Sequence, residues 1–201
     1  HGSADGSQIA FASLRDGNYE IYVMNADGTN VRRMTNNSAA DTQPTWSPDG
    51  TRIAFTALRG GSDREIYVLN INGGNSCGLD ACPLTSNTVN ETGPDWNGTR
   101  IAFTAGVNTE VFLMNDDGSG RRQMTSSASV DQDPAWSADG TYIAFVTNRY
   151  GNLDNYDVAR FTVAQCTSPS SCPVTRLTTA AGADGTGYDF DPSWSPDGTQ
   201  L

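Results

Sequence analysis

The stretch Pro44-Thr45-Trp46-Ser47-Pro48-Asp49-Gly50-Thr51-Arg52-Ile53-Ala54-Phe55 decides the fold, because the chain repeats it with small changes. Pro-Asp-Gly is typical of a tight turn: proline fixes φ, aspartate hydrogen-bonds to nearby backbone and glycine tolerates positive φ. Apolar residues alternate after the turn, so the stretch predicts a β-hairpin. The other copies are Pro94–Phe103, Pro134–Phe145 and Pro192–Leu201.

The spacing of the copies predicts the architecture. The apolar residue after each turn recurs about every 42 to 58 residues, a period typical of β-propeller blades. Each period carries signals for short strands, and no amphipathic helical stretch stands out. In the second period the expected strands are Gln43–Ser47, Arg52–Ala57, Glu65–Asn70 and Pro83–Thr85. The 201 residues therefore form one continuous array rather than separate domains.

A longer pattern runs through the repeats and points to a family. An acidic residue stands three positions before proline, then come Trp-Ser-Pro-Asp-Gly, Ile-Ala-Phe, Glu-Ile-Tyr-Val-Met-Asn-x-Asp-Gly and Arg-Arg-Met-Thr. This pattern resembles the TolB-like (WD40-like) β-propeller repeat over essentially the whole chain. The resemblance implies an all-β propeller whose four blades are four-stranded antiparallel sheets. For the TolB member itself, the family resemblance implies six blades behind an additional N-terminal domain, whereas this sequence has four repeats. The Tol-Pal role of the family therefore does not carry over from the resemblance alone.

The two ends of the repeat array complement each other. The first repeat opens in mid-hairpin without an inner strand, whereas residues 189–201 are an inner strand with no blade behind them. Residues 2–9 and 194–201 duplicate one another in register, so we expect residues 189–201 to complete the first blade. The predicted repeats of the single domain are residues 1–40, 41–90, 91–130 and 131–188.

Three arrangements of these ends are consistent with the sequence. Pairing within one molecule closes a four-bladed ring, and effective concentration favours it. Pairing between molecules builds a head-to-tail row of subunits, which need not close. In the third arrangement the chain is a segment of a longer array.

Charge and residue types exclude several function classes. A net charge of −11 and a pI near 4.2 argue against nucleic acid as a partner, since phosphate binding needs a basic face. No apolar run reaches the length of a membrane span. The only histidine is His1, so a Ser-His or Cys-His nucleophile is close to excluded. A two-carboxylate glycosidase stays formally open.

The four cysteines form two local pairs, Cys77 with Cys82 and Cys166 with Cys172. We predict two disulfides that staple hairpins, each worth about 2 kcal/mol from loop entropy. Disulfides imply an oxidising compartment, hence an extracellular, cell-surface or periplasmic location. The alternative, four thiolates on one metal ion, lacks the usual Cys-x-x-Cys spacing.

The acidic residues three positions before the repeat prolines are the candidate metal ligands. Inner strands line a propeller axis, so four carboxylates at one height would bind a cation, most plausibly calcium. The alternative is structural: each carboxylate accepts backbone N–H bonds and joins blade to blade. The structural role is the favoured one of the two; calcium would be the only cofactor, and its candidate ligands are Asp41, Glu91, Asp131 and Asp189.

The remaining candidate residues have simple structural interpretations. The strand-heading acids Glu20, Glu65 and Glu110 are expected to be architectural, and the tryptophans to pack between blades. The stretches 150–157 and 183–191 break the repeat and gather aromatic, amide and acidic groups, as in a binding surface, a calcium loop or a merely longer loop. Three sequons are candidate glycosylation sites if the host glycosylates: Asn36, Asn90 and Asn97.

Together these features predict a non-enzymatic, secreted or cell-surface β-propeller that binds a protein or serves as a structural assembly module. Self-association through the chain ends would extend it head to tail into a filament. One alternative is a catalytic propeller such as a polysaccharide lyase or hydrolase. The other is a periplasmic TolB-like adaptor, which would require further domains in the full gene.

Overall fold

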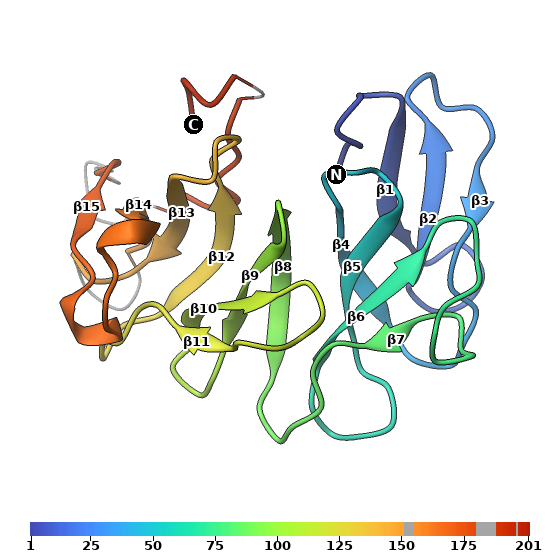
Figure 1. Ribbon diagram of the computed structural model, residues 1–201, viewed down its shortest axis with the longest axis horizontal. Coiled ribbons are helices and arrows are strands. Elements are labelled where there is room, and N and C mark those ends of the chain that lie inside the picture. Colours follow the sequence, from blue (N-terminus) through green and yellow to red (C-terminus); the bar gives the residue numbers. More distant parts are fainter. Residues whose placement is uncertain (151–154, 180–187, 196) are drawn as a thin grey trace.

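The computed structural model describes residues 1–150, 155–179, 188–195 and 197–201. The expected all-β architecture is confirmed: the described strands form four antiparallel sheets that follow one another along the chain (Figure 1). Each sheet is one blade and is built from strands consecutive in sequence. Among the described residues no helix is long and apolar enough to cross a membrane.

The blades share one strand order, from an inner to an outer strand. Blade 1 contains β1 (Gln8–Ser13), β2 (Glu20–Asn25) and β3 (Arg32–Arg33). Blade 2 contains β4 (Asp41–Trp46), β5 (Arg52–Ala57), β6 (Glu65–Asn70) and β7 (Cys82–Pro83). Blade 3 contains β8 (Glu91–Asn97), β9 (Arg100–Ala105), β10 (Glu110–Asn115) and β11 (Arg122–Gln123). Blade 4 contains β12 (Asp131–Trp136), β13 (Tyr142–Thr147), β14 (Asp157–Thr162) and β15 (Val174–Arg176).

The second strand of each full blade is buried on both faces. In β5, Ile53, Ala54 and Phe55 are all fully buried, although neighbouring side chains of a strand point to opposite faces. A blade in the middle of the array has a neighbour on either side, so both of its faces face protein. This explains why Ile-Ala-Phe recurs as a continuous apolar run rather than a strict alternation.

Among the described residues, three hydrophobic clusters hold adjacent blades together. Each combines small or β-branched residues of one blade with the Trp, Ile and Phe of the next; Ala10, Ile21 and Val23, for example, pack with Trp46 and Phe55. The tryptophans of blades 2, 3 and 4 are buried, as predicted. The hydrophobic effect therefore acts mainly between blades, which makes the core a series of interfaces.

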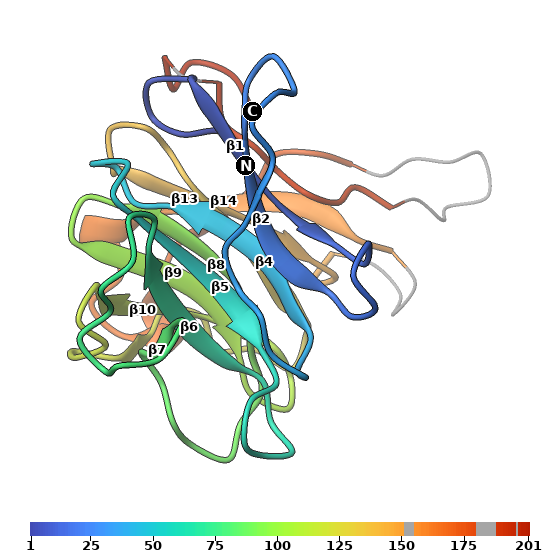
Figure 2. The ribbon, with the colours of Figure 1, turned by 90° about the vertical axis from the view of Figure 1, so that its right-hand side faces the viewer.

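The four blades stand side by side as an arc (Figures 1 and 2). The inner strands β4, β8 and β12 contact one another in that order, and β1 of blade 1 contacts β4. Blades 1 and 4 lie at opposite ends of the longest axis in Figure 1. Residues 189–195 do not pair with β1; they lie against blade 4, where the Trp194 Nε1–H donates to the carbonyl oxygen of Ala135 at 3.1 Å. Within this structure the ring is therefore not closed by residues 189–201.

Candidate binding face at the inner strands

The four acidic residues that stand three positions before the repeat prolines are called the axial acids. The backbone N–H of each axial acid joins its own strand to the blade before it. The N–H of Asp41 donates to the carbonyl of Tyr19 at 2.8 Å, and that of Asp131 donates to Thr109 at 2.7 Å. The N–H groups of Glu91 and Asp189 make the same bond to the preceding blade. Each acid therefore marks the point where an inner strand is fastened to the blade before it.

The carboxylates of three of these four acids are paired with arginines. Asp41, Glu91 and Asp131 are fully buried and pair with Arg59, Arg121 and Arg149 respectively. Burial raises the pKa of Glu91 above its ordinary value, although hydrogen bonds and Arg121 oppose the shift. Within the described residues, no group of three or more His, Cys, Asp or Glu side chains is placed to hold a metal ion. The ion pairs favour the structural interpretation, and the calcium site stays a prediction.

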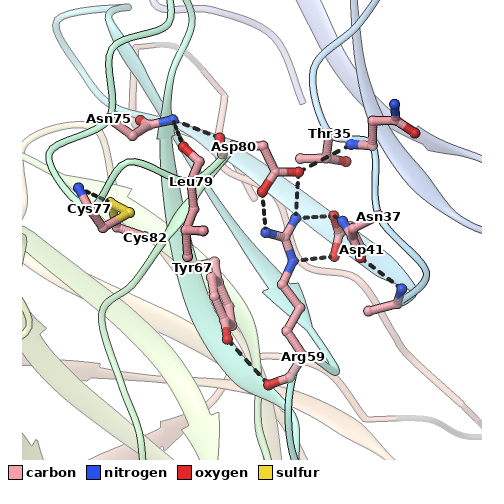
Figure 3. Close-up of polar contacts among 12 residues, drawn as sticks. Thr35, Asn37, Asp41, Arg59, Tyr67, Asn75, Cys77, Leu79, Asp80 and Cys82 are labelled. Atoms are coloured by element: carbon pink, nitrogen blue, oxygen red, sulfur yellow. Dashed lines mark hydrogen bonds and ion pairs between the residues drawn. A yellow bond between two sulfur atoms is a disulfide. The ribbon is translucent and has the colours of Figure 1, made fainter.

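One of these pairs belongs to a network between blades 1 and 2 (Figure 3). The Arg59 guanidinium lies between the carboxylates of Asp41 and Asp80, and its Nη1 is 2.6 Å from Asp80 Oδ1. Asp80 also accepts the backbone N–H of Asn36 in blade 1 at 3.1 Å. Partial burial opposes ionisation of Asp80, but the bonds from Asn36 and Arg59 hold its pKa below the ordinary value.

The loop that carries Asp80 is closed by the Cys77–Cys82 disulfide, and the second predicted pair, Cys166–Cys172, is also bonded. Within the first loop the Asn75 side chain donates to the carbonyl of Asp80 at 2.7 Å. The disulfide and Asn75 together fix the position from which Asp80 reaches Arg59. This staple therefore supports an interface between blades as well as its own hairpin.

The acids that head the third repeat strand are architectural in the structure. Glu20 accepts the Thr35 hydroxyl at 2.5 Å, and Glu110 accepts the Thr125 hydroxyl at 2.6 Å. Glu65 accepts the backbone N–H of Asn87 at 2.6 Å. These bonds tie the strand start to the loop that leads into the next blade, so the same residue type recurs for a folding reason.

A feature that sequence reasoning missed is a bulge in every inner strand. The register of β4, β8 and β12 shifts after the second residue, and the next residue adopts a positive φ. Bulges re-aim side chains and often lie beside functional sites. In sequence, each residue with this positive φ stands two positions after an axial acid. We call these residues the bulge residues; they are Gln43, Gly93, Asp133 and Asp191.

The bulge residues face one another across the inner strands. The Gln43 Oε1 accepts the backbone N–H of Gly93 at 3.2 Å, and a Cβ on Gly93 would lie 3.5 Å from Asp133 Oδ1. Burial and the nearby Asp191 carboxylate raise the pKa of Asp133. The result is a small polar patch with acidic character beside blade 4.

Beside this patch lies an aromatic cluster of Tyr156, Tyr188 and Phe190. The ring centroids of Tyr156 and Phe190 are 5.2 Å apart, and those of Tyr188 and Phe190 are 5.8 Å apart. Tyr188 is 57% exposed and Phe190 48% exposed. The sequence singled out these stretches because they break the repeat; residues 151–154 and 183–187 of them lie outside the described residues.

The predicted glycosylation sites lie in different environments. The Asn36 side chain is exposed, whereas the Asn97 amide donates to the carbonyl oxygens of Ser137 and Ala138 at 2.9 and 3.2 Å. The Asn90 Oδ1 accepts the backbone N–H of Arg64 at 2.9 Å. Asn36 and Asn90 are exposed and Asn97 is partly buried, and glycosylation stays a prediction.

A hollow of about 550 Å³ is lined by residues of blades 3 and 4. Its described lining includes Arg100, Arg122 and Thr141, and it contains no carboxylate or histidine. No nucleophile and base meet there. Neither the described lining of this hollow nor the set of bulge residues includes a histidine that could serve as base for a hydroxyl nucleophile.

Comparison with known proteins places these features in a family. The profile described as "TolB beta propeller domain" matches residues 2–80. A Protein TolB homolog of Chlorobium luteolum is 34% identical over 164 residues, which are 75% of this chain and 34% of that protein. The Tol-Pal system protein TolB of Desulfosudis oleivorans is 32% identical over 60% of this chain and 27% of its own length.

The fold comparison agrees. The structure of putative TolB from Agrobacterium tumefaciens superimposes with a TM-score of 0.78 at 25% identity, covering 98% of this chain and 69% of that one. The matched part of the chain spans 34% and 27% of the length of the two curated relatives. Its repeat sequence, its four blades and these likenesses agree, and the chain belongs to the TolB-like β-propeller repeat family.

Proposed function

We propose that the chain is the propeller part of a TolB-like adaptor, which binds a protein partner in a Tol-Pal type of system and has no enzymatic activity. The observation that carries this proposal is the 34% identity to a TolB homolog over three quarters of the chain. The predicted location, extracellular, cell-surface or periplasmic, is confirmed by the TolB relatives. The disulfides fit such an oxidising compartment.

The surface that we assign to partner binding combines the aromatic cluster with Asp133 and Asp191. Exposed aromatic rings are enriched at protein interfaces because they bury a large area with few rotatable bonds. The neighbouring carboxylates select a partner with basic or amide groups opposite them. Nearly all of the other acidic residues of the repeats make hydrogen bonds or ion pairs within the fold. This contrast supports the assignment of Asp133 and Asp191 to the binding surface.

Binding can be tested with matched tyrosine variants. Tyr156 and Tyr19 occupy the same position in blades 4 and 1, each directly before the acid that heads a strand, but only Tyr156 belongs to the aromatic cluster. We expect the purified chain to bind the Pal protein of the same organism in calorimetry. Tyr156→Ala should weaken binding by about 10- to 100-fold, whereas Tyr19→Ala should change it little. Absence of binding by the unaltered chain would refute the adaptor proposal.

A catalytic propeller is the alternative with the least support. The described residues hold no nucleophile–base pair, and the repeat acids are hydrogen-bonded within the fold. Turnover of a polysaccharide by the purified chain would nevertheless establish it.

A calcium ion held by the axial acids is kept as a separate proposal. Arg59, Arg121 and Arg149 are the cations that compete with it for these carboxylates.

A second candidate function is structural self-assembly. It stays a prediction from the sequence, since residues 189–195 lie against blade 4 of the same chain. Sedimentation of the purified chain over a range of concentrations tests whether such association occurs.

A further inference from the structure

The hollow lined by blades 3 and 4 contains two arginines that no described carboxylate neutralises. Its lining includes Arg100 and Arg122, and a second hollow of about 220 Å³ shares both residues. The Arg122 Nη1 donates to the carbonyl oxygen of Cys166 at 3.1 Å. Within the described part of the chain neither arginine forms an ion pair, and the Arg100 side chain forms no hydrogen bond. In a chain of net charge −11, this pair of guanidinium groups makes a local site for an anion.

Strand register places both arginines on the face of blade 3 that packs on blade 4. Ala102, Leu113 and Arg122 stand in one row across β9, β10 and β11. Arg100 stands two residues before Ala102, and alternate residues of a strand share a face. Ala102 and Leu113 belong to the hydrophobic cluster that includes Phe161 of blade 4. The two arginines therefore belong to the interface between these blades.

The interface between blades 2 and 3 shows which group fits opposite such an arginine. Arg52 is the first residue of β5, as Arg100 is the first residue of β9. The Arg52 Nη2 lies 2.7 Å from the Oδ2 of Asp116, which follows β10 in blade 3. The backbone N–H of Asp116 donates to the carbonyl of Thr99 at 3.0 Å. At this interface a carboxylate of the next blade therefore neutralises the arginine.

Blade 4 has a valine where blade 3 has this aspartate. The N–H of Val163 donates to the carbonyl of Thr141 at 3.0 Å, which is the bond that Asp116 makes to Thr99. Val163 is buried and lines the hollow. The interface between blades 3 and 4 therefore has the arginine, Arg100, and lacks the acid that would pair with it.

The rest of the described lining suits a carboxylate. It includes Thr141, Thr162 and Thr167, whose hydroxyl groups can donate to carboxylate oxygens. The Thr141 hydroxyl already donates to Asp139 at 2.7 Å, so Thr162 and Thr167 are the hydroxyl donors that remain. A guanidinium group matches a carboxylate with two parallel N–H donors. A carboxylate that enters the hollow would break no ion pair of the described residues.

We propose that this hollow binds a carboxylate group of a ligand, with Arg100 and Arg122 as its cationic contacts and Thr162 and Thr167 as hydroxyl donors. The ligand carboxylate has the role that the Asp116 side chain has between blades 2 and 3. It belongs either to an acidic side chain of a peptide or protein or to a small free carboxylic acid. At physiological salt, repulsion from distant acids of the chain is screened beyond about 8 Å, whereas contact with the two guanidinium groups is not.

This site is separate from the aromatic cluster and does not rest on the proposed adaptor role. Tyr156 directly precedes β14 and Thr162 ends it, so the two sites lie at opposite ends of that strand. Both blades that line the hollow contain four strands among the described residues (Figure 1). Failure of Pal to bind would leave this inference standing, and failure of carboxylates to bind would leave the adaptor proposal standing.

An NMR titration of the isotope-labelled chain tests the proposal with three probes: the capped peptide acetyl-Gly-Asp-Gly-amide, succinate and inorganic phosphate. We expect a carboxylate probe to shift the Nε–Hε signals of Arg100 and Arg122 and the backbone amide signals of Thr162 and Thr167. The expected dissociation constant is about 0.1–1 mM, as for a small ligand held by a few polar contacts. Absence of these shifts with both carboxylate probes up to about 10 mM would overturn the proposal.

The probes and three arginine variants separate the possible outcomes. Binding of the peptide alone would support the site and assign it to acidic side chains, whereas binding of succinate as well would support it for small carboxylic acids too. Phosphate that binds about tenfold more tightly than either carboxylate would overturn the assigned ligand class. Arg100→Gln and Arg122→Gln each remove one exposed cation, so each should leave the fold intact and weaken carboxylate binding about tenfold or more. Arg64→Gln, an exposed arginine outside the hollow, is the matched control; equal weakening by it would show a response to net charge alone and would overturn the site.

The valine provides a test in the opposite direction. Val163→Asp places an acid where blade 3 has Asp116, so its carboxylate should pair with Arg100 and weaken binding of the carboxylate probe about tenfold or more. Val163→Asn loses the same apolar packing, has nearly the same size as the aspartate and carries no charge. It should bind the probe much as the unaltered chain does, so comparison of the two variants isolates the effect of the charge. Equal probe binding by Val163→Asp and Val163→Asn would contradict the assignment of Arg100 to the carboxylate.

Discussion

Asp139 illustrates how single side chains hold each repeat turn together. Its carboxylate accepts the Ser137 hydroxyl at 2.7 Å, the Thr141 hydroxyl at 2.7 Å and the Thr141 backbone N–H at 3.0 Å. These hydrogen bonds lower the pKa of Asp139 to about 2, and the bond from Ser137 has the largest effect. Asp49 and Asp197 make the same bonds in their own turns. The sequence predicts this role because Ser-x-Asp-Gly-Thr places every donor within a few residues of the acid.

The lowered pKa of Asp139 predicts an acid-sensitive turn. A carboxyl group whose pKa is lower in the folded than in the unfolded chain stabilises the fold above its unfolded pKa, and this contribution is lost as pH falls through the folded pKa. Stability should therefore decline between pH 3.8, the ordinary value, and about 2. Asp139→Asn should lower stability at neutral pH and flatten this decline. Urea unfolding at several pH values measures this decline in the free energy of unfolding. An equal decline in the variant and the unaltered chain would show that Asp139 does not titrate in this way.

At the same scale the bulge residues show where sequence reasoning stops. Asp41 and Asp131 are recognisable because an acid recurs before each repeat proline. Gln43, Gly93, Asp133 and Asp191 have no shared chemistry, because the constraint on them is a positive φ that several residue types can adopt. Their mutual approach depends on the placement of whole blades. The raised pKa of Asp133 could therefore not be foreseen from its neighbours in sequence.

At the scale of elements, the strands of the second repeat follow the prediction closely. The expected Arg52–Ala57 and Glu65–Asn70 coincide with β5 and β6. The inner strand β4 begins at Asp41, two residues before the predicted Gln43, because the bulge lets pairing continue past the proline. The two staples were predictable from cysteine spacing. Their role between blades was not, since it requires Asp80 to meet Arg59.

The Cys77–Cys82 loop should therefore couple to the blade interface. Replacing both cysteines by serine should cost about 2 kcal/mol from loop entropy. It should also weaken the interaction between Asp80 and Arg59, because a freer loop no longer fixes Asp80. A double-mutant cycle with Asp80→Asn and Arg59→Gln, measured by urea unfolding with and without the disulfide, gives this coupling.

The second disulfide provides the control for this cycle. Cys166→Ser with Cys172→Ser should cost a similar amount of stability and leave the Asp80–Arg59 coupling unchanged, since that loop lies in blade 4. Equal coupling with and without Cys77–Cys82 would show that the first loop is a local staple only.

For the whole molecule, the arginine pairs lead us to expect stability without a metal ion. Asp131 pairs with Arg149 and accepts the Thr147 hydroxyl at 2.6 Å, so its charge and hydrogen bonds are satisfied. A chelator should shift the melting temperature by less than about 2 °C. Calcium held at 100 times its dissociation constant would instead add about 2.7 kcal/mol, roughly 5–10 °C for a chain of this size. A shift of that size on chelation, reversed by calcium, would establish the calcium proposal.

The arc also predicts that damage stays local. Phe145 and Phe55 are both fully buried, but Phe145 packs between blades 3 and 4 and Phe55 between blades 1 and 2. Either Phe→Ala change should cost about 3–5 kcal/mol. Blades that contact only their neighbours behave as nearly independent interfaces, so Phe145→Ala should reduce hydrogen-exchange protection mainly in β8–β15, and Phe55→Ala mainly in β1–β7. Each variant is the control for the other at matched residue type and burial. Equal loss of protection along the chain in both variants would mean that the blades unfold as one unit, as expected of a closed ring rather than an open arc.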